Sequence, residues 1–267
     1  MRFTSERRFD DLVERRFMLG EICGILWVPE SASSSGQVPL ILAGQPGGPA
    51  GLDLTYPALR GRAQSAARAG FATATIELPG SGARAEPAGV DQARAELRQA
   101  VTDGKRVADD LIDRLVLPLV DRAVPEWQST LDALLAVPEI GDRVGYSGGV
   151  ISVGTRLAAV EPRISAAVLF AGSYVPRTIM EEARHVTIPL YVLLQWDDEH
   201  NDRHVALDLF DAFGTREKTL NANLGGHTGV PQHAGEEATR FFTRHLRSVE
   251  GGPAVERARA TPPRERR

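Results

Sequence analysis

The chain has 267 residues, 42% of them hydrophobic and 25% charged, and this length can bury a substantial core in one large domain or two small ones. Its formal net charge of -4 leaves no excess of basic residues, which excludes a surface suited to nucleic acid. A single cysteine, Cys23, excludes an intramolecular disulfide and a thiolate-rich metal site. We expect Cys23 to be a small buried hydrophobic residue on a strand, in a protein of a reducing compartment.

Charged residues mark both ends of the chain. Residues 1–16 lack the apolar segment of a secretory signal, and no later apolar run is long enough to span a bilayer. We therefore expect a cytoplasmic protein that does not associate with a membrane. Residues 251–267 contain glycines, prolines and clustered arginines with little to bury, which predicts a disordered tail after a single domain over residues 1–250.

Apolar runs alternate with helical patterns, which predicts an α/β fold with a mostly parallel central sheet and helices on both faces. An opening hairpin is expected within residues 13–29. Further strands are expected at residues 38–44, 71–78, 164–172, 188–196 and 217–223. Helices are expected around residues 56–70, 126–137, 148–160, 204–213 and 234–246.

The stretch from Ala85 to Val124 has apolar positions at helical spacing, and we interpret it as a helical insertion. Pro118 is expected to kink or break a helix there, because proline lacks the N–H that the helix needs. The insertion could form a lid over a pocket, or its apolar face could pack on the body of the domain. The sequence is compatible with both interpretations.

Three predicted strands run into residues that are typical of catalytic sites. The strand at 38–44 is followed by a glycine-rich segment, that at 188–196 by Asp197 and Asp198, and that at 217–223 by His227 between glycines. Loops at the carboxyl ends of parallel strands converge on one edge of a sheet. A serine becomes a nucleophile when a histidine takes its proton and a carboxylate orients that histidine.

Ser147, Asp198 and His227 occur in the chain order serine, acid, histidine. This order, together with the segments LAGQPGG, IELPGSG, GYSGG, LLQWDDE and LGGHTGVP, resembles the α/β-hydrolase superfamily over about residues 10–247. The nearest branch is that of dienelactone hydrolases and small esterases. The resemblance implies Ser147 as nucleophile, His227 as general base and Asp198 as the acid, with Asp197 as the alternative.

The resemblance also implies an oxyanion hole formed by the backbone N–H groups of Gly47 and Gly148. The chain departs from the family at Gln45 and Pro46, where the usual pair is histidine and glycine, and proline has no N–H to donate. We expect the side chain of Gln45 to donate in its place.

The remaining histidines lie in polar surroundings and are interpreted as surface residues; they are His185, His200, His204, His233 and His245. They show no recognisable metal-ligand spacing, so neither a metal ion nor another cofactor is expected.

Three registers are possible for the turn that carries the nucleophile. Ser147 has the small neighbours Gly145 and Gly149 that this crowded turn needs, although the charged residues before Val144 leave only a short strand. Ser152 would follow a longer strand, but Val150 would then occupy the place of the first glycine. In the third register Val150 itself stands at the turn, and the protein lacks a serine nucleophile. Ser147 is the preferred candidate.

The sequence thus predicts a serine hydrolase that acts on a small-molecule ester, lactone or thioester. One alternative is an enzyme of the same fold that has lost the nucleophile and works as a cyclase or lyase, with His227 and Asp198 as acid–base residues. A catalytically inert binding protein on this fold is the other alternative. The oligomeric state is left open.

Overall fold

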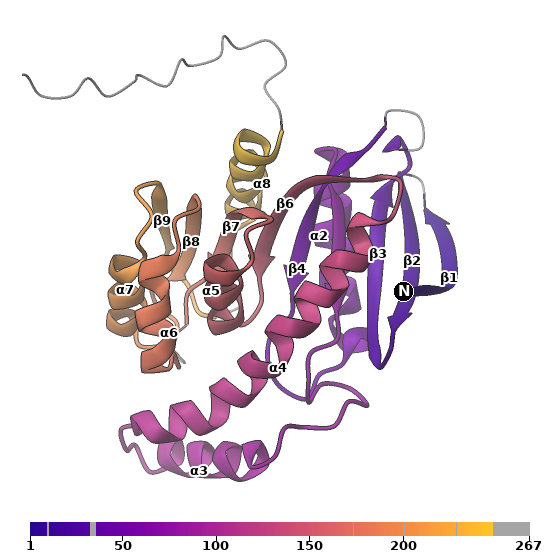
Figure 1. Ribbon diagram of the computed structural model, residues 1–267. Coiled ribbons are helices and arrows are strands. Elements are labelled where there is room, and N and C mark those ends of the chain that lie inside the picture. Colours follow the sequence, from indigo (N-terminus) through magenta and orange to yellow (C-terminus); the bar gives the residue numbers. More distant parts are fainter. Residues whose placement is uncertain (10, 33–35, 173, 200, 228, 248–267) are drawn as a thin grey trace, which may run out of the picture.

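The structure is a computed structural model that describes residues 1–9, 11–32, 36–172, 174–199, 201–227 and 229–247. In this part of the chain, nine strands form one sheet with helices on both faces (Figure 1). The strands are β1 (Arg2–Phe9), β2 (Leu12–Leu19), β3 (Ile22–Pro29), β4 (Val38–Gly44), β5 (Ala72–Ile76), β6 (Ile140–Gly148), β7 (Ile164–Phe170), β8 (Leu190–Gln195) and β9 (Lys218–Asn223). The helices are α2 (Leu52–Arg68), α3 (Val90–Thr102), α4 (Asp109–Leu135), α5 (Ile151–Val160), α6 (Arg177–Glu182), α7 (Arg203–Ala212) and α8 (Gln232–Leu246), with a 3-10 turn at Ala183–His185. The predicted tail, residues 251–267, lies outside the described residues.

The strand order is β1-β2-β3-β5-β4-β6-β7-β8-β9. Pairs from β5 through β9 are parallel, whereas β1, β2 and β3 pair antiparallel to their neighbours. The prediction of a mostly parallel sheet covered on both faces is therefore confirmed. Because the parallel strands point the same way, the loops that follow β4, β6, β7, β8 and β9 meet at one edge of the sheet.

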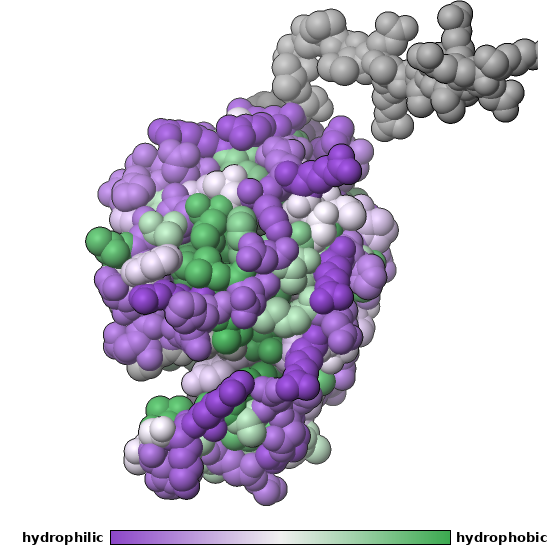
Figure 2. Space-filling model, turned by 90° about the vertical axis from the view of Figure 1, so that its left-hand side faces the viewer, coloured by the Kyte–Doolittle hydropathy of each residue, from purple (hydrophilic) through white to green (hydrophobic). Residues whose placement is uncertain are grey.

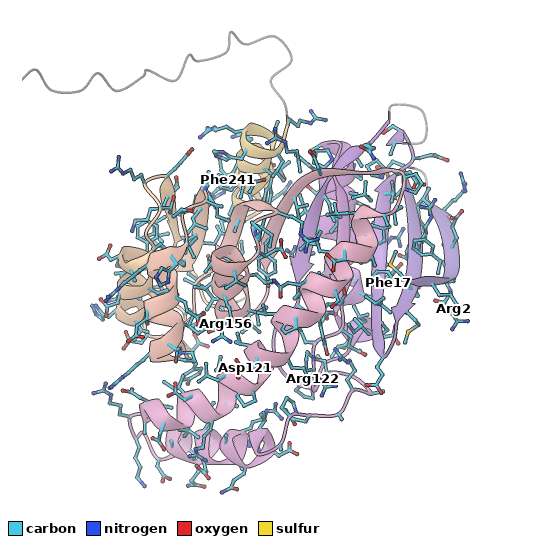
Figure 3. All side chains as sticks on the ribbon, in the orientation of Figure 1. Arg2, Phe17, Asp121, Arg122, Arg156 and Phe241 are labelled. Carbon is cyan, nitrogen blue, oxygen red and sulfur yellow. The ribbon has the colours of Figure 1, made fainter. Side chains whose placement is uncertain are left out.

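Two helical layers enclose the sheet. Apolar side chains of α4, α5, α6 and α7 pack on one face, and those of α2 and α8 pack on the other. On the first face, Arg156 of α5 connects three helices, because its guanidinium donates hydrogen bonds to Asp121 of α4 and Glu182 of α6 (Figure 3). In the part of the chain that the structure covers, no helix is both long and apolar enough to cross a membrane.

Strand β1 was not expected from the sequence. Its residues are almost all exposed and strongly charged, and it pairs only with β2, at the edge of the sheet. The pattern lacks the alternation of buried and exposed residues from which strands are recognised. Charged side chains on an edge strand also oppose pairing with another molecule, which gives this composition a structural explanation.

Strand β6 is longer than expected, since it includes Asp142 and Arg143. Its pairing with β4 shifts between the pairs Val38–Ile140 and Leu40–Val144, so β6 advances four residues while β4 advances two. This irregularity leaves Asp142 and Arg143 exposed. A β-bulge of this kind allows charged residues within a central strand without burying their charges.

Helix α4 has no break at Pro118, one of the two outcomes expected for this proline. It continues through Pro118 and Pro125 to Leu135 as one helix of 27 residues, so the predicted boundary at Val124 is not the end of an element. Nine of its residues are buried, among them Val120 and Trp127 on either side of Pro125. This continuous apolar face holds the helix against the sheet and outweighs the loss of hydrogen bonds at two prolines.

Cys23 lies on β3 as expected, but it is only partly buried, and its thiol donates a hydrogen bond to Glu77 at 3.1 Å. Burial, followed by this neighbouring carboxylate, raises the pKa of Cys23 to about 11. Since the thiolate is the reactive form, we expect a disulfide reagent such as DTNB to react about 100-fold more slowly with native protein than with urea-unfolded protein at about pH 8. Absorbance of the released thiolate measures both rates, and equal rates would contradict the assignment.

Candidate active site

A cavity of about 1100 Å³ opens where the central parallel strands end. Its walls come from the loop after β4, the turn after β6, the end of β7, the loop after β9, and the helices α2, α3, α4 and α8. Figure 2 shows a hollow between the body and the lower part of the molecule, which in Figure 1 is formed by α3 and the beginning of α4. The predicted insertion thus contributes Val90, Leu97, Leu115 and Leu119 to the cavity wall.

Asp198 and His227 are brought together beside this cavity. His227 Nδ1 lies 2.7 Å from Asp198 Oδ2, and the Asp198 side chain is buried while that of His227 is about half exposed. Asn201 Nδ2 donates to the same carboxylate oxygen at 2.5 Å. The rings of His227 and of Phe170, at the end of β7, form a T-shaped pair with 5.4 Å between ring centroids. The alternative acid, Asp197, is exposed to solvent.

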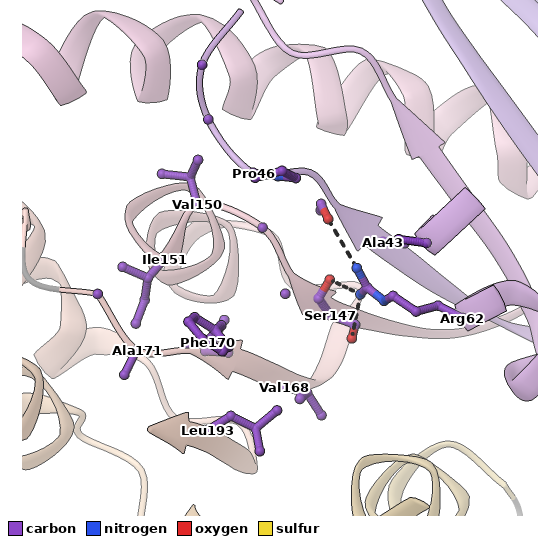
Figure 4. Close-up of a pocket in the computed structure, with 18 of the residues that line it drawn as sticks. Ala43, Pro46, Arg62, Ser147, Val150, Ile151, Val168, Phe170, Ala171 and Leu193 are labelled. Atoms are coloured by element: carbon purple, nitrogen blue, oxygen red, sulfur yellow. Dashed lines mark hydrogen bonds between the residues drawn. The ribbon is translucent and has the colours of Figure 1, made fainter. Parts of the chain in front are cut away.

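Ser147 lines the same cavity but lies within strand β6, where it pairs with Ala43 and Val168. Arg62 Nη2 donates hydrogen bonds to Ser147 Oγ at 3.1 Å and to the Ser147 carbonyl at 2.8 Å (Figure 4). Among the described residues, no hydrogen bond joins Ser147 Oγ to His227, and no residue other than glycine has a positive φ. Ser147 therefore lacks the strained backbone that is typical of a nucleophile at a strand-to-helix turn.

The turn itself is formed by Gly148, Gly149 and Val150, after which α5 begins at Ile151. Gly148 and Gly149 have φ values of +71° and +74°, which favour glycine. A Cβ on Gly149 would lie 2.7 Å from Gly44 Cα, so β4 also excludes a side chain there. No residue of this turn carries a nucleophilic side chain.

Ser152 lies on α5 and is fully buried. Its hydroxyl oxygen has no hydrogen-bond partner in the described part of the chain, and the residue is not part of the cavity wall. Ser152 is thus placed in the interior rather than at the cavity.

Of the three residues expected to bind an oxyanion, Gly47 and Gly148 line the cavity and Gln45 does not. Gly47 lines the cavity close to Val150, since a Cβ on Gly47 would lie 3.2 Å from Val150 Cγ2. Gly148 faces the guanidinium of Arg62. The expectation for Gln45 is not supported: its buried amide donates to the Ile76 carbonyl and accepts from Thr55, and it does not line the cavity.

Backbone N–H groups at the beginning of α5 are a further candidate for this role. The first N–H groups of any helix lack acceptors within the helix and carry partial positive charge. Here Val150, the residue before α5, and Ile151, its first residue, both line the cavity.

Arg62, which sequence reasoning missed, is a charged residue of the cavity wall. It projects from α2, is exposed, and within the described ranges donates hydrogen bonds to oxygens of Gly44 and Ser147. The available sequence signal was the small residues at helical spacing before and after it, Ala58 and Ala66, which leave room for the side chain to lie in the cavity.

The other histidines were expected at the surface. His185, His204 and His233 are exposed, as expected, whereas His245 is partly buried and its Nε2 lies 3.3 Å from Glu217. His200 is outside the described residues. Within the described ranges, no group of three or more His, Cys, Asp or Glu residues is arranged to hold a metal ion.

No family model and no curated protein matches the sequence, whereas solved structures resemble the fold. The chain is similar to a cold-adapted esterase from an Arctic intertidal metagenomic library, with 26% identity, a TM-score of 0.70 and coverage of 92% of this chain and 100% of that one. The chain is an α/β-hydrolase-fold protein. This confirms the predicted fold and superfamily.

Two further neighbours extend the comparison of this α/β-hydrolase. Acetyl xylan esterase 1 from Thermoanaerobacterium sp. is 13% identical with a TM-score of 0.62, over 91% of this chain and 87% of that one. A dienelactone hydrolase from Anabaena variabilis is 19% identical with a TM-score of 0.51, over 91% and 99%. At these identities the likeness concerns the fold. The esterase and hydrolase neighbours as a group support the prediction that the chain is an enzyme of the α/β-hydrolase type.

Proposed function

We propose that the protein hydrolyses a small carboxylic ester or lactone, with His227 as general base and Asp198 as the residue that orients it. The observation that carries this proposal is the 2.7 Å contact between His227 Nδ1 and Asp198 Oδ2 beside the cavity. With Nδ1 held by the carboxylate, Nε2 is the ring atom that accepts a proton, and the buried carboxylate stabilises the charged ring that results. The names of the structural neighbours, esterases and a dienelactone hydrolase, support ester or lactone as the bond.

Two groups can attack the carbonyl carbon. Ser147 lines the cavity with His227, but its hydroxyl contacts Arg62 and it precedes the glycine turn. A water molecule activated by His227 can attack the carbonyl carbon without a nucleophilic side chain at the glycine turn. The geometry therefore favours water, with Ser147 as the second candidate.

The favoured reaction runs in two steps. His227 Nε2 takes one proton from water while the water oxygen bonds to the carbonyl carbon, and the tetrahedral intermediate that results carries an oxyanion. The backbone N–H groups of Gly47 and of the first residues of α5 are the donors proposed for that oxyanion. The intermediate then breaks its bond to the alkoxide, which recovers the proton from His227.

Ser147→Ala distinguishes the two nucleophiles, with Ser152→Ala as the matched control. Activity is measured on p-nitrophenyl acetate, p-nitrophenyl butyrate and simple lactones. If water attacks, Ser147→Ala retains activity within about tenfold of the original, and a fluorophosphonate probe does not label Ser147. Loss of about 10⁴-fold or more, with an adduct on Ser147, would assign the attack to this serine instead.

The glycine turn also favours one other candidate function, a cyclase or lyase without a nucleophilic residue. In that case the same substrates would show no hydrolysis by the original protein at any pH. The His227–Asp198 pair would then move protons on a substrate that is not hydrolysed.

A further inference from the structure

We propose that Gln45 and Ser81 are positioning residues, which hold the loop after β4 so that the backbone N–H of Gly47 is fixed beside the reacting carbonyl. This inference deepens the proposed function, on which it rests for the role of Gly47 as an oxyanion donor. It starts from Gln45, where the chain departs from the α/β-hydrolase pattern and whose side chain the reaction does not use.

The side chain of Gln45 connects the beginning of this loop to two other elements. Gln45 follows β4 directly and is only 2% exposed. Its Nε2 donates a hydrogen bond to the carbonyl of Ile76, the last residue of β5, at 2.6 Å, and its Oε1 accepts one from Thr55 of α2 at 2.8 Å. An amide has both donors and an acceptor, so this one side chain satisfies both partners.

The next residues of the loop are bound to the segment that follows β5. Ser81, which is also 2% exposed, donates from Oγ to the Gly48 carbonyl at 2.9 Å. The backbone N–H of Gly82 donates to the Pro49 carbonyl at 3.0 Å. Together with the bond from Gln45 to Ile76, these contacts attach the loop to β5 and its following turn at three successive points.

The segment after β5 is itself anchored, so it can serve as a support. The N–H of Glu77 donates to the Cys23 carbonyl on β3 at 2.9 Å, and the Glu77 carbonyl accepts from Arg84 at 2.6 Å. Glu77 Oε1 accepts the N–H of Leu52, where the loop passes into α2, at 3.0 Å. Both ends of the loop are therefore bound to one fixed part of the sheet.

Gly47 lies between these attachments. Gln45 is bound before it, and Gly48 and Pro49 are bound after it, whereas no residue in the described part of the chain accepts a hydrogen bond from the Gly47 N–H. Since Gly47 lines the cavity, its N–H is available to a ligand. A shift of about 1 Å in a catalytic group can lower a rate about 100-fold, so the attachments on either side determine what this donor contributes.

A double-mutant cycle tests the inference. Gly47→Pro removes the N–H, and Gly47→Ala is its matched control because it adds a Cβ but keeps the N–H. We expect Gln45→Ala to lower kcat for p-nitrophenyl butyrate about 10–100-fold and Ser81→Ala about tenfold, with KM changed less than about threefold. In the Gly47→Pro background, Gln45→Ala should lower kcat by less than about threefold more, because its effect passes through an N–H that is already absent.

Ser165→Ala is the control for loss of a similar bond elsewhere, since the Ser165 hydroxyl donates to the Val144 carbonyl at 3.2 Å and Ser165 does not line the cavity. It should leave kcat unchanged. An unchanged kcat in Gln45→Ala, or a full additional loss in the Gly47→Pro background, would overturn the inference. If Gly47→Pro does not fold, the loss of kcat at constant KM in Gln45→Ala and Ser81→Ala, compared with Ser165→Ala, decides the question.

Hydrogen–deuterium exchange separates this inference from the proposed function. Gln45→Ala should speed exchange of the peptide of residues 45–55 at least about tenfold, whereas Ser165→Ala should not, because only the first variant releases the loop. Faster exchange in Gln45→Ala, with no ester hydrolysis by the original protein, would reject the function and retain the attachment of the loop. Hydrolysis by the original protein, with exchange and kcat both unchanged in Gln45→Ala, would do the reverse.

Discussion

Replacing His227 with alanine is expected to lower kcat for ester or lactone hydrolysis by about 10²–10⁴-fold, because the variant has no group to take the proton of the attacking nucleophile. The prediction follows from the position of the ring, whose Nδ1 contacts buried Asp198 and which packs against Phe170 beside the cavity. It holds whether the attacking oxygen belongs to water or to Ser147. Initial rates at saturating substrate measure the effect.

Two variants make this experiment specific. His233→Ala removes an exposed histidine at the beginning of α8 and should leave kcat unchanged. Asp198→Asn keeps the shape of the acid but removes its charge, so it should also lower kcat strongly while KM changes little. Normal activity in His227→Ala, with a thermal unfolding curve like that of the original, would reject His227 as the base.

Replacing Trp127 with alanine is expected to lower the free energy of unfolding by about 3–5 kcal/mol, which is a large fraction of the stability of a typical domain. Trp127 is fully buried in α4 and meets Tyr146 edge-to-face, with 6.2 Å between ring centroids. Tyr146 directly precedes Ser147 on β6, so the cavity left by alanine would lie directly behind the strand that carries the glycine turn. Urea denaturation followed by circular dichroism measures the change.

Leu54→Ala is the control for this experiment, since Leu54 is a large hydrophobic residue of α2 whose side chain is 76% exposed. Its effect should stay within about 0.5 kcal/mol. Trp127→Phe should cost less than Trp127→Ala, because phenylalanine refills most of the space. If Trp127→Ala unfolded at the same urea concentration as the original protein, the packing of α4 against β6 would have to be reconsidered.

Much of the fold could be predicted from local patterns. Strand β4 has the bounds that its apolar run indicated, residues 38–44, because a buried parallel strand needs apolar residues on both faces. The longer β6 and the edge strand β1 could not be predicted in the same way. Their charged residues are accommodated by a bulge and by an edge position, and both depend on neighbouring strands that a local pattern does not contain.

The candidate site, too, could be predicted only in part from the sequence. Strand ends and chain order indicated His227 and the acids Asp197 and Asp198, and the resemblance to the α/β-hydrolases favoured Asp198, which the fold brings to hydrogen-bonding distance of His227. The place of Ser147 depended on where the strand stops and the helix starts, and the two glycines with positive φ decide this. The contact of Arg62 with Ser147 could not be predicted, because it joins an exposed arginine of α2 to the end of β6, which lies 85 residues further along the chain.

The contact between Gly149 and Gly44 also limits how this turn can change. A serine at position 149 would place its Cβ against the backbone of β4, so that position could acquire a hydroxyl only if the strands moved apart. Position 150 has no such restriction, since Val150 already has a side chain, an extended backbone and a place directly before α5. Among the positions of this turn, residue 150 is therefore the one that accepts a larger side chain without strain, and a serine there would also cap the helix behind it.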